Sequence, residues 1–132
     1  MCFAVAHDGA SVLLLEKGRP AALRGKWMGV GGHIEPGETP HEAIVRESKE
    51  EADLDVSQWE SLGVVERDNG TIHMYAAFVD LATAKTTTDE QVRVFTWDEV
   101  EQLVLSDATQ EILASVKSFA SRGPRPVSAP RF

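Results

Sequence analysis

The stretch GETPHEAIVRESKEEADL, residues 37–54, predicts a helix that is crowded with carboxylates. Thr39 suits the N-cap and Pro40 the first helical position, and Glu42 follows the cap by three residues, as in a capping box. We therefore expect a helix at about 40–52, in or next to which five glutamates stand. They are Glu38, Glu42, Glu47, Glu50 and Glu51.

The two sides of this helix differ in character. At about 100° per residue, Glu47, Glu50 and Glu51 gather on one side. Glu47 and Glu51 are four residues apart, and two charges ~6 Å apart repel by roughly 3 kcal/mol at an effective dielectric near 20. A solvated acidic face and a site for a hard cation such as Mg²⁺ or Mn²⁺ both fit this pattern. The packing side carries His41, Ile44, Val45, Ser48 and Ala52.

Composition sets the limits for the rest of the chain. Its 132 residues are the length of one domain, which can bury about two-thirds of its unfolded surface. The single Cys2 excludes an internal disulfide and a cysteine-based zinc cluster. The first apolar run is short and contains His7 and Asp8, so we expect no signal peptide and a cytoplasmic location. No run approaches the ~20 apolar residues of a membrane helix, and a net charge of −8 disfavours nucleic-acid polymers as partners.

Short apolar runs bounded by turn residues predict a sheet. The first two runs form one hairpin, and the next two form another around Asn69-Gly70, a dipeptide suited to the left-handed positions of a tight turn. Residues 17–32 hold five glycines and a proline, which favours a loop that leads into a short strand. The expected strands lie at 2–7, 11–16, 59–68, 71–80 and 91–97.

A second helix is expected at about 108–120. Asp107 would be its N-cap, with Gln110 as the capping-box partner. From 121 to 132 the chain has three prolines and little to bury, which predicts a flexible tail after a domain at 1–120. Strands, helix, strands and a terminal helix give an α+β domain with layers. The apolar stripe of the last helix is Ile112, Leu113, Val116 and Phe119.

The spacing of residues 32–54 resembles the Nudix box, the sequence signature of the Nudix hydrolases. Five residues separate Gly32 from Glu38, and seven more precede Arg46. The resemblance implies the family's α/β/α sandwich around a mixed β-sheet, with the helix at about 40–52 as the catalytic helix. The other charged positions of the box are also in register, namely Glu47, Glu50 and Glu51.

Two positions depart from the usual box. Ser48 stands where an aliphatic residue is normal, and its hydroxyl can bond back to the Ile44 carbonyl. Asp53 stands where glycine normally ends the helix in a left-handed conformation, which Asp tolerates better than most residues but less well than Gly. Neither position is a candidate metal ligand.

Nudix hydrolases cleave a nucleoside diphosphate linked to another moiety by attack of water on a phosphorus of the diphosphate bridge. The resemblance therefore implies a nucleotide pyrophosphatase with Mg²⁺ as cofactor, and Mn²⁺ as an alternative. It assigns Glu47 and Glu51 as the principal metal ligands and Glu50 as a further ligand or the catalytic base. A backbone carbonyl of Gly31 or Gly32 would complete the coordination.

The resemblance also assigns supporting residues. Glu38 would hold Arg46 so that Arg46 orients Glu47. Many members add a carboxylate from a later loop, and Glu90 is the best match here, with Asp89 as the second choice. A polar turn before a strand explains that pair equally well.

Residues 14–39 resemble the corresponding segment of Nudix proteins that sanitise nucleoside triphosphates, oxidised purines included. Cations in an otherwise acidic chain are candidates for phosphate contacts, although they can also serve only to balance the surface. Trp27 could stack on a base or belong to the core. The candidate cations are Lys17, Arg19, Arg24 and Lys26.

Two further positions weaken the inference that this chain shares the substrate of those enzymes. Met28 occupies the place of a base-reading asparagine in the oxidised-purine enzymes of animals, and a thioether cannot supply that paired donor and acceptor. Asp107 falls near the acidic base-reading residues of those enzymes, but its expected capping role already explains it.

The leading hypothesis is Mg²⁺-dependent hydrolysis of a nucleoside triphosphate, oxidised forms included, to the monophosphate and pyrophosphate. The alternatives are an ADP-ribose or dinucleoside polyphosphate pyrophosphatase and a non-catalytic nucleotide-binding module. Dimers are common in the family, so the resemblance also allows a homodimer. The four histidines show no metal-ligand spacing and are interpreted as surface or packing residues: His7, His33, His41 and His73.

Overall fold

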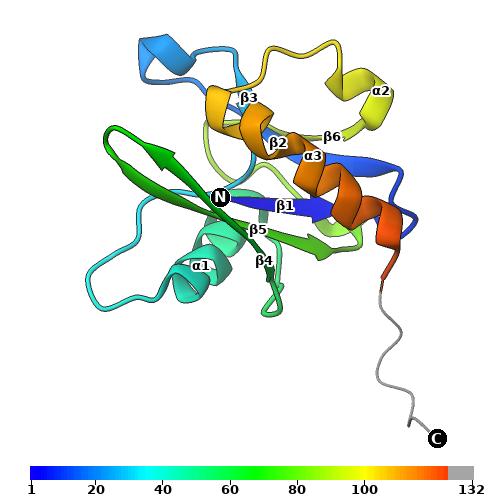
Figure 1. The fold of residues 1–132 in the computed structure, drawn as a ribbon, viewed down its shortest axis with the longest axis horizontal. Coiled ribbons are helices and arrows are strands. Elements are labelled where there is room, and N and C mark those ends of the chain that lie inside the picture. The colour runs from blue at the N-terminus through cyan, green and yellow to red at the C-terminus, as the bar shows by residue number, and fades with distance from the viewer. Residues whose placement is uncertain (125–132) are drawn as a thin grey trace, which may run out of the picture.

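The computed structural model describes residues 1–124, which form a mixed β-sheet covered by helices (Figure 1). The strand order is β3-β2-β1-β5-β4, with β6 paired to β2. β1 and β5 run parallel, whereas the other paired strands are antiparallel. The predicted mixed sheet is thus confirmed. The strands are β1 Cys2–Val5, β2 Ser11–Glu16, β3 Trp27–Met28, β4 Glu60–Arg67, β5 Gly70–Phe78 and β6 Val92–Thr96.

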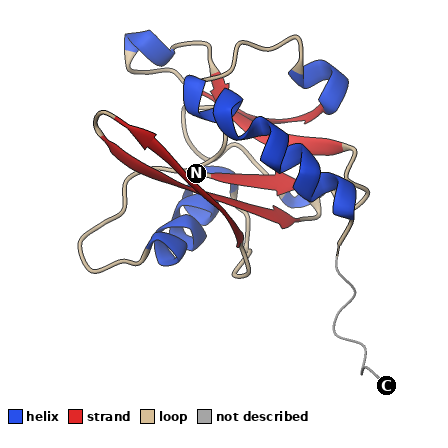
Figure 2. Cartoon of the chain, viewed as in Figure 1, coloured by secondary structure: helices blue, strands red, loops and turns tan. Residues whose placement is uncertain are grey.

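Two long helices cover opposite faces of the sheet, as Figure 2 shows. Phe3 of β1 belongs to the apolar cluster that contains Phe119 of α3, whereas the next residue, Ala4, belongs to the cluster that contains Ile44 of α1. This alternation follows from the pleat of a strand whose two faces are both buried. The α/β/α sandwich is therefore confirmed. The helices are α1 Pro40–Ala52, α2 Trp97–Val100 and α3 Asp107–Arg122, with 3₁₀ turns at Ala21–Leu23 and Leu81–Thr83.

The start and end of α1 agree with the local signals. The Thr39 hydroxyl accepts from the Glu42 N–H, and the Glu42 carboxylate accepts from the Thr39 N–H, which completes the capping box. Asp53 takes the left-handed conformation with φ 55° and ends the helix. Ser48 is fully buried, but its hydroxyl donates to the carbonyl of Val45 and not to that of Ile44.

The last helix begins where it was expected, but the predicted N-cap, Asp107, is wrong. Ser106 is the N-cap of α3 and accepts from the Thr109 N–H, so Asp107 is the first helical residue. Gln110 forms no capping box, because its side-chain amide donates to the Leu105 carbonyl.

Two other boundaries also differ from expectation. In the β4–β5 hairpin Arg67 pairs with Gly70, so the turn consists of Asp68 and Asn69, and Asn69 is not left-handed. α3 continues to Arg122, two residues into the expected tail, and the part of that tail at 125–132 lies outside the described residues. Within residues 1–124 no helix is long and apolar enough to cross a membrane.

Candidate functional site

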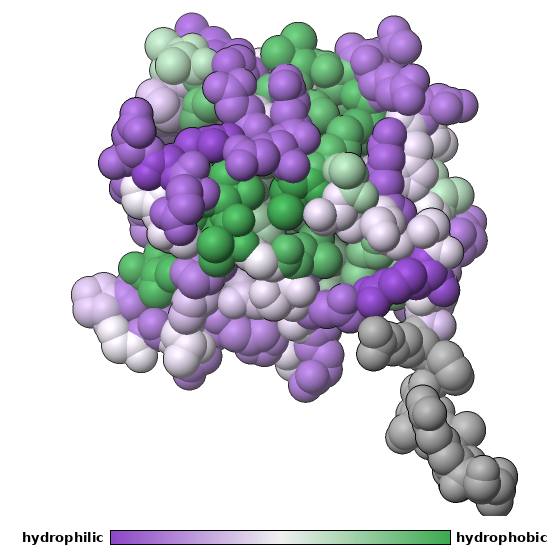
Figure 3. All heavy atoms as spheres, viewed as in Figure 1, coloured by the Kyte–Doolittle hydropathy of each residue, from purple (hydrophilic) through white to green (hydrophobic). Residues whose placement is uncertain are grey.

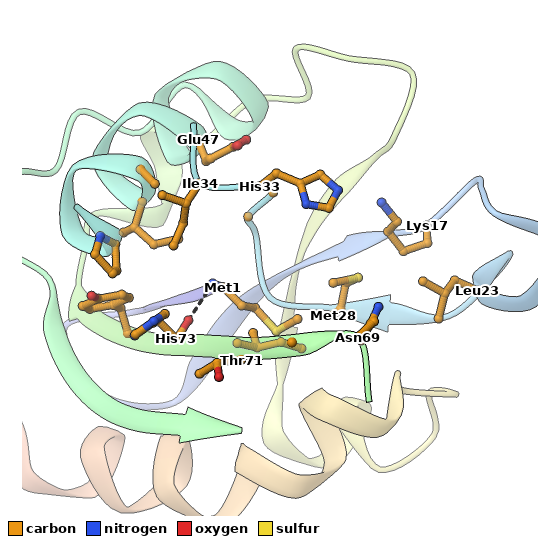
Figure 4. Close-up of a pocket in the computed structure, with 18 of the residues that line it drawn as sticks. Met1, Lys17, Leu23, Met28, His33, Ile34, Glu47, Asn69, Thr71 and His73 are labelled. Atoms are coloured by element: carbon orange, nitrogen blue, oxygen red, sulfur yellow. Dashed lines mark hydrogen bonds between the residues drawn. The ribbon is translucent and has the colours of Figure 1, made fainter. Parts of the chain in front are cut away.

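A cavity of about 590 Å³ lies between α1, β5 and the glycine-rich segment before α1 (Figure 4). Glu47 reaches it from α1, His33 from the loop before that helix, and Lys17 from the loop that follows β2. In this view the His33 ring lies between the Glu47 carboxylate and the Lys17 ammonium. Figure 3, which looks down on the face shown in Figure 1, shows hydrophobic side chains gathered at its middle inside a hydrophilic rim. The lining of the cavity itself includes the apolar side chains of Met1, Met28 and Ile34, so it combines charged groups with apolar walls, as is common in sites for small molecules.

Glu47 is a buried carboxylate that depends on Gly32. It is 7% exposed, unlike a residue on a solvated acidic face. A Cβ atom added to Gly32 would lie 2.5 Å from Glu47 Oε1, so only glycine leaves this carboxylate in place. Burial is the main cause that raises the pKa of Glu47, and the charge of Arg46 partly offsets it.

Arg46 binds several carboxylates at once. Its Nε donates to Glu38 Oε2 over 2.8 Å, and its Nη2 donates to Glu38 Oε1 over 2.9 Å, a two-point arrangement. Nη2 also lies 3.2 Å from Glu47 Oε1, and Nη1 donates to Glu50 Oε2 over 3.1 Å. The Arg46 hydrogen bonds are the main cause that lowers the pKa of Glu38 to about 2. The structure thus brings together Glu38, Arg46 and Glu47, as the box spacing implies.

The pKa of Glu51 is raised to about 7. Burial is the main cause, followed by the charge of Glu47 and, to a smaller extent, that of Glu90. The Gly31 N–H, 3.4 Å from Glu51 Oε2, and the charge of Lys17 act in the opposite direction. Several carboxylates therefore repel one another beside the cavity, an arrangement that a cation would stabilise.

Glu90 is held by the loop that follows β2. Its Oε2 lies 3.3 Å from Lys17 Nζ and accepts from the Gly18 N–H over 2.9 Å. The second choice, Asp89, is exposed and lies 3.8 Å from Arg19.

Among the residues the structure describes, no three His, Cys, Asp or Glu side chains are gathered closely enough to form a metal-binding group.

The donor set nevertheless fits a hard divalent cation. Glu47 and Glu51 offer carboxylate oxygens one helical turn apart, and oxygen ligands are what Mg²⁺ and Mn²⁺ prefer. The pKa values of both carboxyls are raised by burial, so positive charge nearby would favour their ionised forms. The charge of Glu90 also raises the pKa of Glu51, so these two carboxylates are close enough to interact.

The cavity includes some of the predicted substrate residues and not others. Lys17 and Met28 line it. Arg19 is exposed and forms a long ion pair of 3.8 Å with Asp89. Arg24 is also exposed, and its side chain donates to the Gly18 carbonyl. Lys26 is half-buried but is not among the lining residues.

Trp27 and Asp107 lie outside the cavity. Trp27 is 7% exposed and packs edge-on against Phe95, with ring centroids 4.8 Å apart. These contacts place it in the core and leave no face for a base. Asp107 is exposed in the first turn of α3 and does not line the cavity, so neither capping nor a cavity contact explains it.

The lining residues that the sequence interpretation did not assign to the site include His33, His73 and Tyr75. His33 directly follows the glycine pair, and Arg46 Nη2 donates to its carbonyl over 3.1 Å. His73 and Tyr75 come from β5, forty residues further along the chain, so no spacing rule could connect them to His33. The sequence did offer one signal: His73 and Tyr75 are two residues apart on an expected strand, so their side chains lie on the same face.

The comparisons with known proteins agree with this geometry. The model of the NUDIX domain family matches residues 1–118. An ADP-ribose pyrophosphatase of Haemophilus influenzae is 38% identical, over 57% of this chain and 40% of its own. Putative nudix hydrolase 1 of Caenorhabditis elegans is 32% identical, over 73% of this chain and 26% of its own. The chain thus spans only 26% and 40% of the lengths of these two relatives.

Solved structures share the fold. A structure from work on MutT of Aliivibrio salmonicida and Vibrio cholerae has a TM-score of 0.77 at 18% identity, covering 89% of this chain and 94% of its own. The NUDIX domain of Shewanella oneidensis NrtR, in complex with ADP ribose, has a TM-score of 0.77 at 17% identity, covering 89% and 84%. Because the family model matches nearly all of the described residues, this chain belongs to the NUDIX domain family.

Proposed function

We propose that this domain is a pyrophosphohydrolase that cleaves the diphosphate bridge of a nucleoside diphosphate derivative with a divalent metal, Mg²⁺ in the first place. The observation that carries the proposal is a pair of shielded carboxylates one helical turn apart. Glu47 is buried, lines the cavity and contacts Arg46, and its charge raises the pKa of the partly buried Glu51. A helix that needed only a solvated face would not bury Glu47.

Glu47, Glu51 and Glu90 are the residues that would hold the metal, with the Gly32 carbonyl as a further oxygen donor. A bound divalent metal neutralises charge on the phosphate oxygens and lowers the pKa of water. Arg46 fixes the position of the Glu47 carboxylate through its contact at 3.2 Å. Other metal-binding proteins likewise orient their ligands through hydrogen-bonded neighbours.

Glu38 and Glu50 both accept hydrogen bonds from Arg46. Glu38 holds the guanidinium at two points, so the position of Arg46 is fixed before substrate arrives. Glu50 Oε2 is held by Arg46 Nη1 while its side chain is 57% exposed, which leaves Oε1 free to take a proton from water. We propose Glu50 as the base or as a further metal ligand.

We propose two candidate substrate classes. A nucleoside triphosphate, oxidised forms included, is the first candidate, and the presence of the Lys17 ammonium in the cavity supports it. ADP-ribose or a dinucleoside polyphosphate is the second, and the ADP-ribose pyrophosphatase of H. influenzae supports it. We also keep the cytoplasmic location and the homodimer as proposals, which fractionation and gel filtration can check.

A substrate panel tests the proposed function. Purified protein is incubated with Mg²⁺ and nucleoside triphosphates, ADP-ribose or dinucleoside polyphosphates, and the products are identified. Pyrophosphate from a triphosphate supports the first class, and AMP from ADP-ribose supports the second. Tight nucleotide binding without turnover at any Mg²⁺ or Mn²⁺ concentration would instead indicate a binding module.

A further inference from the structure

Lys17 takes part in two environments at once. Its ammonium lies 3.3 Å from Glu90 Oε2 and 3.4 Å from Glu90 Oε1, and the same side chain lines the cavity (Figure 4). The Lys17 charge also lowers the pKa of Glu51, whereas the Glu90 charge raises it. Lys17 is thus a cation that acts on both of these carboxylates, while the Met1 ammonium is close enough to interact with Glu47 and Glu51.

The pair is well shielded from water. The side chains of Lys17 and Glu90 are 22% and 15% exposed, whereas Arg19 and Asp89 beside them are 80% and 78% exposed. Solvent screens charges less at such a site, so the Lys17–Glu90 contact is stronger than an ordinary surface ion pair. Lysine is also a compact charge on a flexible stem, which suits a group that changes partners.

We propose that Lys17 is an internal counter-ion that competes with the divalent metal for the Glu51–Glu90 carboxylates and, once displaced, binds a phosphate group of the substrate. The inference rests on the proposed function, because it takes both carboxylates as metal-binding groups. It explains why the Glu90 carboxylate is paired with the Lys17 ammonium and the Gly18 N–H.

The exchange couples metal and nucleotide. Metal binding frees the Lys17 ammonium, so the nucleotide binds more tightly when metal is present. By thermodynamic linkage, the nucleotide must tighten metal binding by the same factor. Removal of Lys17 should therefore have opposite effects on the two ligands: tighter metal binding alone and weaker nucleotide binding.

The test is titration calorimetry of the nucleotide-free protein with Mn²⁺ at low salt. We expect Lys17→Met to bind Mn²⁺ about tenfold more tightly than the wild type, because a competing charge beside the ligands is gone. Lys17→Arg, which keeps the charge, should stay near the wild-type affinity. Lys26→Met is the matched control, because Lys26 is on the same loop but does not line the cavity and forms no ion pair within residues 1–124.

A purely structural role for Lys17 predicts a different result. If Lys17 only anchors the loop, Lys17→Met should weaken Mn²⁺ binding or leave it unchanged. In that variant the Gly18 N–H still holds Glu90. Either result would overturn the inference. Lys17→Gln serves as a second variant if the methionine variant does not fold, and thermal unfolding in EDTA reports the fold of each.

The same titration separates this inference from the proposed function. If the wild type binds Mn²⁺, Glu51→Gln does not, and Lys17→Met shows no gain, only the role of Lys17 is wrong. If the wild type binds no Mn²⁺, the metal site itself is wrong and the inference falls with it. A non-hydrolysable nucleotide analogue, titrated with metal present, should bind Lys17→Met several-fold more weakly than the wild type.

Discussion

Replacing Glu51 with glutamine should stabilise the metal-free domain at pH 8 and abolish its turnover. The pKa of Glu51 is raised from its ordinary value of 4.5 to about 7, chiefly by burial. The folded state therefore keeps a proton that the unfolded chain loses, and stability decreases as the pH rises from about 4.5 through about 7. That difference in pKa corresponds to about 3 kcal/mol, and partial exposure of the carboxyl reduces this to about 1–2 kcal/mol.

The assay is urea unfolding in EDTA at pH 5 and pH 8. Glu51→Gln should have a higher free energy of unfolding than the wild type at pH 8. The gain should shrink at pH 5, because the Glu51 carboxyl of the folded wild type is already protonated at that pH. Glu50→Gln is the matched control on the same helix, because the Glu50 side chain is 57% exposed and its replacement should change stability by less than about 0.5 kcal/mol. Equal or lower stability of Glu51→Gln at pH 8, or wild-type turnover with Mg²⁺, would refute the reasoning.

Three further substitutions probe the site and the core. Gly32→Ala should lower kcat about 10- to 100-fold with little change in melting temperature, because the added methyl group would displace the flexible carboxylate of Glu47. An unchanged kcat would contradict the role of Gly32. Arg46→Lys should also lower kcat by about 10- to 100-fold, since lysine cannot hold Glu38 at two points, and the effect should not add to that of Glu38→Gln in a double-mutant cycle. Trp27→Ala should lower the free energy of unfolding by about 3–5 kcal/mol, whereas a stable variant with a raised KM would restore the base-stacking role.

Local signals predicted α1 well because they act within a few residues. Thr39, Pro40 and Glu42 define the start without tertiary help, and Asp53 adopts the left-handed exit expected at its position. The same logic erred at α3, where Ser106 and Asp107 are both good caps and the structure has the buried Ser106 in that role.

Contacts between distant elements could not be read from the sequence. The helical projection placed Glu47 with the exposed carboxylates, but the sheet and Gly32 bury it beside the cavity. The pairing of Lys17 with Glu90 spans 73 residues, and only the sheet brings the two loops together. Residue types therefore predicted the chemistry of the site, while the fold determined which charges meet.

The most direct test of the central claim is hydrolysis in ¹⁸O-labelled water, with the products analysed by mass spectrometry. With Mg²⁺ and a substrate from the panel, we predict one ¹⁸O atom in one of the two phosphate-containing products, and no product with EDTA or with Glu51→Gln. Product formation that persists in EDTA, label outside the phosphates, or no cleavage of any panel substrate would contradict metal-dependent hydrolysis of a diphosphate bridge by this domain.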